Sequence, residues 1–280
     1  QYTIQQPIMP NRLLCMLALT LAGTFLYAQR ISGIFRTTDA QMEYLEQLDW
    51  ETFVQEDERL NSEGYRLTNI ETTGQGAERT YWGIYTESSL RDTLIKTNSW
   101  VNFVKAKRAM ASAGFLLSNV QAYAISETDA HFVGVWYKND TDTPHKIWKL
   151  DSPESLNAKT EDMAKQQFYL QEVEVFLTPS GTANYLAIYH YSPIPVRNYV
   201  QIYTEEEVFD KDRQQRQRSK IRLVDYERYN AKEADYQLGV YQPGTYDNRI
   251  LFNYLRADFN GKWEQLEKEG LKLVGWEVRG

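Results

Sequence analysis

Residues 64–87 read GYRLTNIETTGQGAERTYWGIYTE, and related stretches recur along the whole chain. The first part of each copy has an apolar residue, any residue, a leucine and another apolar residue three positions later. Self-similarity at a fixed spacing indicates a repeat architecture. The shared leucines, at steps of 50, 53, 53 and 50 residues, are Leu67, Leu117, Leu170, Leu223 and Leu273.

A second landmark is a small residue followed two positions later by an aromatic one. Aromatic side chains at a fixed place in every unit are typical of core packing, although they can also form a stacking platform for a sugar or peptide. We expect the core role here. The pairs are Gly33 with Phe35, Gly83 with Tyr85, Gly134 with Trp136, Ala187 with Tyr189 and Gly239 with Tyr241.

Two further landmarks complete the unit. Short apolar stretches contain Tyr44, Leu94, Ile147, Val200 and Ile250, and charged stretches with helical spacing open at Phe53, Phe103, Leu156, Phe209 and Phe259. Gly64, Gly114 and Gly270 follow three of these stretches as expected helix caps, whereas Gln167 and Lys220 stand there in the other two. Each unit is therefore predicted to be strand, strand, short strand and helix.

The two ends of the repeat region complement one another. It begins with a second-type strand, ISGIF, and finishes with a first-type strand, LKLVGWEVR. Pairing them removes the exposed edges of an open array. We expect a mainly β fold with short helices, a five-unit closed propeller-like ring whose last unit is completed by the N- and C-terminal strands. An open solenoid is the alternative.

Residues 11–28, NRLLCMLALTLAGTFLYA, are typical of a secretory signal peptide, with Arg12 before an apolar stretch and Ala28 at the cleavage point. A membrane anchor, a buried helix or a lipoprotein built on Cys15 are the alternatives. We expect residues 1–28 to be signal and extension, and residues 29–280 to be one exported repeat domain, secreted or periplasmic, without a membrane span.

The composition excludes several classes of function. Cys15 is the only cysteine, so a mature chain from residue 29 would have no disulfide and no cysteine metal site or nucleophile. The net charge of −7 argues against a general nucleic-acid binder. The basic run 211–220, KDRQQRQRSK, is expected to be a solvated helix face.

The recurring pattern resembles the bacterial tandem repeat domain family over residues 30–280. It is carried by GYRLTNIETTGQGAERTYWGIYTE, its four counterparts and the following WETF-type helix start. The resemblance implies a secreted repeat fold, also found in the amino-terminal domain of fungal polyglycine hydrolases. Those enzymes carry catalysis in a separate serine hydrolase domain. The Ser-x-x-Lys and Gly-x-Ser-x-Gly motifs are absent here, so no catalytic residue carries over.

Polar residues recur on the first-type strands at two places, two and four residues after the shared leucine. Strand alternation predicts that both positions share the leucine's face. If these strands line the axis of a ring, the carboxylates repel one another and require a cation, an amine-bearing ligand or basic partners. We call the two sets the glutamate tier, Glu71, Gln121, Glu174, Glu227 and Glu277, and the asparagine tier, Asn69, Asn119, Glu172 and Asp225, with Gly275 in the fifth unit.

For these acids we favour ordinary cross-strand ion pairs over a ring that binds a ligand or cation, for example Glu71 with Arg79, or Glu227 with Arg228 or Lys232. The three histidines have no metal-ligand spacing: His131 begins a strand, His145 lies in a loop and His190 ends a strand. Neither a cofactor nor a metal site is predicted from the motifs.

We therefore expect a secreted, non-catalytic scaffold that binds a peptide or glycan at the loop face or at the axis of the ring, with the two tiers as the candidate ligand-binding residues. A hydrolase with an unrecognised site and a purely structural envelope protein are the alternatives. Catalysis in a repeat protein usually needs one unit with a histidine or carboxylate unlike its counterparts, and no clear break of this kind is present. The oligomeric state and the ligand's identity are left open.

Overall fold

The computed structural model describes residues 29–232 and 234–279, which form five three-stranded antiparallel sheets and five α-helices. The predicted signal peptide lies outside the described residues. The first-type strands, called the inner strands below, are β3 (Tyr65–Thr73), β6 (Phe115–Ala124), β9 (Phe168–Leu177), β12 (Ile221–Ala231) and β15 (Leu271–Arg279).

The other two strand types complete each sheet. The second-type strands lie in the middle and are β1 (Arg30–Thr37), β4 (Thr80–Glu87), β7 (Ala130–Lys138), β10 (Ala183–Tyr191) and β13 (Ala234–Pro243). The third-type strands lie on the far edge and are β2 (Met42–Leu48), β5 (Asp92–Thr97), β8 (His145–Leu150), β11 (Tyr199–Tyr203) and β14 (Asn248–Leu255).

One helix follows each third-type strand, so the predicted order of elements within the unit is confirmed. A short 3-10 helix, η1 (Gly76–Glu78), lies in the turn between β3 and β4. The helices are α1 (Trp50–Ser62), α2 (Trp100–Ser112), α3 (Pro153–Lys165), α4 (Glu206–Arg218) and α5 (Arg256–Lys268).

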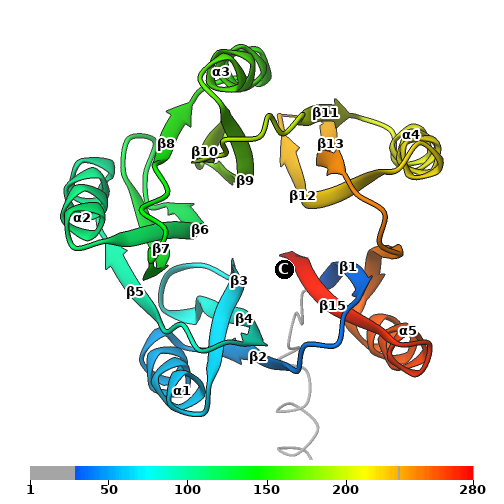
Figure 1. Ribbon diagram of the computed structural model, residues 1–280, viewed down its shortest axis with the longest axis horizontal. Helices are drawn as coiled ribbons and strands as arrows, with labels where there is room; N and C mark the ends of the chain where they lie inside the picture. Colours follow the sequence, from blue (N-terminus) through cyan, green and yellow to red (C-terminus); the bar gives the residue numbers. More distant parts are fainter. Residues whose placement is uncertain (1–28, 233, 280) are drawn as a thin grey trace, which may run out of the picture.

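The five sheets stand around a common centre, with the inner strands nearest to it and the helices at the periphery (Figure 1). Neighbouring inner strands contact one another in the order β3, β6, β9, β12, β15, and β15 in turn contacts β3. β1 pairs with both β14 and β15, so the fifth sheet combines segments from both ends of the described chain. This is the strand pairing that the two ends of the repeat region predict.

The helix ends follow the predicted caps, including the two without glycine. Gly64, Gly114 and Gly270 have φ of +91°, +76° and +83°. Gln167 and Lys220 occupy the same place with φ of +65° and +59°, a left-handed conformation that costs non-glycine residues roughly 1–2 kcal/mol. The chain therefore turns in the same way after all five helices, whatever residue stands there.

The repeated apolar landmarks form the core, as expected. Every second-type aromatic and every helix residue of the fourth landmark is fully buried, including Tyr85 and Phe53. The small residue of the second-type strand is required by close packing, because a Cβ added at Gly83 would lie 3.0 Å from the Phe53 ring. The recurring aromatics are core residues between sheet and helix, not an exposed stacking platform.

One prediction about the inner strands is wrong. The shared leucine and the two tiers do not lie on the same face, because the register of every inner strand shifts just after the leucine. In β3 the shift falls between Leu67 and Asn69, so Leu67 packs in the core together with Ile70. A β-bulge inserts one extra residue and reverses the alternation beyond it. The tiers therefore face away from the core.

Within the part of the chain that the structure describes, no helix is long and apolar enough to cross a membrane.

Candidate functional site at the centre of the sheets

The structure brings both predicted tiers together at the centre, since each tier residue lies on an inner strand. All five side chains of the glutamate tier are buried, with exposed fractions of 4–8%. In the asparagine tier Asn119 and Glu172 are buried, whereas Asn69 and Asp225 are half-buried. The fifth position of this tier is Gly275, which leaves a gap in it.

Most tier residues bind the backbone of the neighbouring inner strand. The carboxylate of Glu174 accepts a hydrogen bond of 3.1 Å from the N–H of Ala122. The same arrangement recurs around the centre: Glu172 accepts from Val120 N at 3.0 Å, Asp225 from Val173 N at 2.7 Å, Glu227 from Val175 N at 3.3 Å, and Asn69 from Trp276 N at 3.3 Å.

These bonds have a structural cause that the sequence analysis missed. An inner strand is an edge strand, and its outward N–H groups need partners because buried backbone donors are costly to leave unpaired. A tier side chain of the next unit supplies the acceptor, and the donor is the N–H one residue after the corresponding tier position. The only sequence signal is that acceptors recur at these two positions in nearly every unit.

The predicted ion pairs of the tiers are wrong. Arg79 donates to the Thr72 hydroxyl at 2.9 Å and stacks over the Tyr123 ring instead of pairing with Glu71. Arg228 pairs with Glu206 and Asp235. Among the described residues, no lysine or arginine lies within ion-pair distance of a tier carboxylate. No basic side chain among the described residues therefore compensates the tier carboxylates by direct contact.

Three carboxylates of the glutamate tier form a close group, which we call the axial triad: Glu71, Glu227 and Glu277. One oxygen from each lies within 4.8 Å of the others, and all three side chains are buried. Gln121 adjoins this group, since its amide nitrogen donates to Glu71 at 3.2 Å and to Glu174 at 2.6 Å. No donor among the described residues reaches the carboxylate of Glu277.

Burial and mutual repulsion make these acids weak. Burial is the main cause that raises the pKa of Glu277 to about 8, with a further increase from Asp225 and a partial decrease from Arg279 and Arg228. Burial and neighbouring carboxylates raise the pKa of Glu71 and Glu227 well above the ordinary value. The pKa of Asp225 rises to about 6 because burial outweighs its two backbone hydrogen bonds. A positive group entering the centre would reverse these shifts.

The glutamate tier opens into a cavity of about 940 Å³. Its wall includes the axial triad together with Tyr123, Phe176 and Tyr229, whose exposed fractions are 5–9%. On the other side, the asparagine tier lines a smaller cavity of about 80 Å³, where the buried side-chain oxygen of Asn119 has no hydrogen-bond partner. The larger cavity therefore offers carboxylates and aromatic surface to a ligand.

The histidines lie outside the two tiers. His131 and His190 stand near the beginning and the end of second-type strands, as predicted, and His190 bonds to the carbonyl of Leu117 at 2.7 Å. His145 does not lie in a loop but begins β8, where it is buried. Burial and Lys107 lower the pKa of His145 to about 4. None of the three lies on an inner strand.

Comparison with known families identifies the repeats. Residues 43–88, 103–139 and 151–192 match the family described as polyglycine hydrolase-like, structural repeat. These three segments, which together make up less than half of the chain, are similar to that family's repeat. The first match runs from β2 through α1 and β3 to β4, which are the elements of one complete sheet and its helix. This confirms the resemblance drawn from the sequence. No curated protein matches the chain.

Proposed function

We propose that the chain is an exported, non-catalytic repeat scaffold that binds a peptide by a positively charged amine at the axial triad. The five units are proposed to form one closed, propeller-like ring within a single domain. The cyclic order of contacts between inner strands and the pairing of β1 with β15 support this closure. The export rests on the sequence of residues 11–28 alone.

The observation that carries the proposal is the axial triad, which no basic side chain among the described residues contacts. One oxygen from each of its three buried carboxylates lies within 4.8 Å of the others, and burial together with neighbouring carboxylates raises their pKa values. An ammonium group would favour the ionised carboxylates and could donate one hydrogen bond to each, since it carries three donors. The site thus fits the amine of a lysine or of a peptide N-terminus.

The surrounding cavity supports a peptide over a bare ion. Its volume of about 940 Å³ exceeds what a single cation needs, and Tyr123, Phe176 and Tyr229 offer apolar surface beside the carboxylates. A non-catalytic role is supported by the side-chain contacts, because Glu172, Glu174 and Asp225 are engaged by backbone N–H groups.

A peptide array with matched lysine and acetyl-lysine versions of each peptide tests the proposal, with a glycan array and a calcium titration beside it. We expect binding to lysine peptides, loss on acetylation, and loss in the variant Glu227→Gln with Glu277→Gln. The control is Glu58→Gln with Glu264→Gln, which removes the same charge from exposed helix positions. Peptide binding unaffected by the axial variant, or binding of neutral glycans alone, would refute it.

A further inference from the structure

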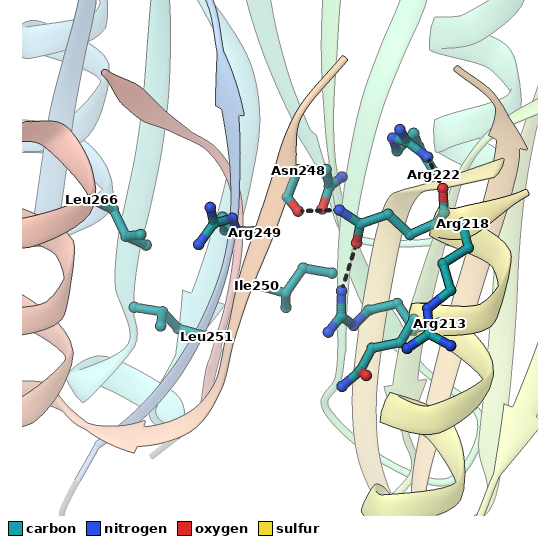
Figure 2. A pocket seen from close by; sticks show the side chains of 10 residues that line it. Arg213, Arg218, Arg222, Asn248, Arg249, Ile250, Leu251 and Leu266 are labelled. Atoms are coloured by element: carbon teal, nitrogen blue, oxygen red, sulfur yellow. Dashed lines mark hydrogen bonds between the residues drawn. The ribbon is translucent and has the colours of Figure 1, made fainter. Parts of the chain in front are cut away.

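A second cavity, of about 610 Å³, lies between the sheet that contains β12 and the sheet that contains β14, and it is rich in arginine (Figure 2). Its wall carries four arginines and no acidic residue, although the chain as a whole has a net charge of −7. We call it the arginine cleft. The basic side chains are Arg213, Arg218, Arg222 and Arg249.

Two of these arginines are already engaged within the fold. Arg213 pairs with Asp210 at 2.6 Å and donates to Gln217. Arg222 is buried and donates to the carbonyls of Gln217 and Tyr246 at 2.7 Å. They shape the cleft and add positive potential, but together they already make five hydrogen bonds within the fold.

The other two arginines keep donors for a ligand. No acceptor among the described residues lies within hydrogen-bond distance of Arg218. Arg249 has one long contact, 3.7 Å from Asp247, and more than half of its side chain is exposed. Figure 2 shows Arg218 on the α4 side, whereas Arg249 lies across β14 on the side toward Leu266. A ligand that reaches both must be extended and carry more than one anionic group.

The arginine cleft breaks the repeat symmetry. The positions equivalent to the four arginines are given by their spacing from the shared leucines and from the third-strand landmarks. In each of the other four units, these positions hold at most two basic residues. This excess is therefore not a requirement of the fold. The equivalents are Asp57, Ser62, Arg66 and Thr93; Lys107, Ser112, Leu116 and Lys146; Thr160, Lys165, Tyr169 and Tyr199; and Trp263, Lys268, Lys272 and Glu43.

The rest of the wall selects among anionic ligands. Ile250 lies on the Arg218 side of β14, whereas Leu251 and Leu266 lie on the Arg249 side, so apolar residues adjoin the basic positions on both sides of the strand. A sugar ring has an apolar face that packs on such surface, whereas an inorganic chain of phosphates does not. Guanidinium groups bind carboxylate and sulfate oxygens through two parallel hydrogen bonds. We propose that the arginine cleft binds an acidic oligosaccharide across the edge of β14, independently of the axial triad.

Calorimetry with three probes tests this proposal: a sulfated heparin oligosaccharide, an oligogalacturonate and inorganic polyphosphate. We expect one of the two oligosaccharides to bind, and Arg218→Ala and Arg249→Ala each to weaken it about tenfold, the loss of roughly one charge-assisted contact. The stronger oligosaccharide identifies the anionic group. Binding should also weaken as salt is added.

The matched control is Lys268→Ala with Lys272→Ala, which removes two charges from the equivalent positions on α5 and β15. Circular dichroism checks that every variant is folded. Equal weakening by the control and the cleft variants, tighter binding of polyphosphate than of both oligosaccharides, or no saturable binding of any probe would overturn the proposal. The axial variant Glu227→Gln with Glu277→Gln should bind the oligosaccharide normally, and its failure to do so would also overturn it.

Discussion

The backbone N–H of Trp276 donates a hydrogen bond of 3.3 Å to the side-chain oxygen of Asn69, which lies 207 positions earlier in the chain. The bond joins β15 to β3, the last and the first inner strands. It repeats the contact that Glu172 and Asp225 make between other neighbouring inner strands. Side chains, and not a continuous backbone ladder, therefore connect the five sheets at the centre.

Removing that connection should weaken the fold modestly. Asn69→Ala leaves the N–H of Trp276 without its acceptor, and we expect the free energy of unfolding to fall by about 1 kcal/mol. Asn119→Ala is the matched control, because the oxygen of Asn119 is buried without a partner and its removal should cost less. Urea denaturation measures both. A loss in Asn119→Ala as large as in Asn69→Ala would contradict this role.

The axial triad should make the free protein less stable at higher pH. The pKa of Glu277 is about 8 in the folded chain and near 4.5 when unfolded, so between these values the folded state holds a proton that the unfolded state releases. The free energy of unfolding therefore falls as the pH rises through this window. Thermal denaturation at pH 5 and pH 8 measures the fall.

Glu277→Gln removes one titrating member of the triad. We expect this variant to lose less stability between pH 5 and pH 8 and to melt at a higher temperature than the parent at pH 8. Exposed Glu264→Gln should keep the parent profile. A loss of stability between pH 5 and pH 8 that is the same in Glu277→Gln as in the parent would show that the pKa of Glu277 is not raised.

Introducing glycine at the two helix ends that lack it should stabilise the protein. Gln167→Gly and Lys220→Gly remove the cost of a left-handed side-chain residue, and we expect each to stabilise the protein by up to about 1 kcal/mol. Gln166→Gly is the control, since Gln166 has a negative φ of −97°. Denaturant titration gives the three values. Destabilisation by both Gln167→Gly and Lys220→Gly would contradict the inferred backbone strain at these positions.

Gly134, the small residue of β7, should be intolerant of a side chain. A Cβ added at Gly134 would lie 2.1 Å from the ring of Trp136, so Gly134→Ala must displace a buried indole. We expect a loss of about 1–3 kcal/mol. Gly261→Ala in α5, where a Cβ meets nothing within 4 Å, should gain up to about 1 kcal/mol. Equal melting temperatures of the two variants would contradict the packing argument.

The sequence alone predicted the unit and much of its core, because apolar periodicity records contacts within one sheet and its helix. It misplaced the tiers relative to the shared leucine, although the odd spacing from Leu67 to Ile70 was a sign of the bulge. Alternation is a rule for regular strands and fails when one residue is inserted.

Contacts between units could not be predicted from the sequence. The acceptors for edge N–H groups, the axial triad and the arginine cleft depend on the relative orientation of neighbouring sheets, which the repeat period does not determine. The basic run 211–220 was interpreted as a solvated face, yet the Arg213 side chain is only 13% exposed and the Arg216 side chain 18%. Likewise Arg228 pairs with Asp235 across its hairpin and not with Glu227.

Proton release on binding tests the central claim most directly. An amine bound at the axial triad requires its carboxylates to ionise, so a lysine peptide selected from the array should release about one proton or more at pH 7. Calorimetry in phosphate and in Tris, which differ in ionisation heat, measures this number. Release that disappears in Glu227→Gln with Glu277→Gln is the predicted result. Identical heats in both buffers with the parent protein would contradict the account.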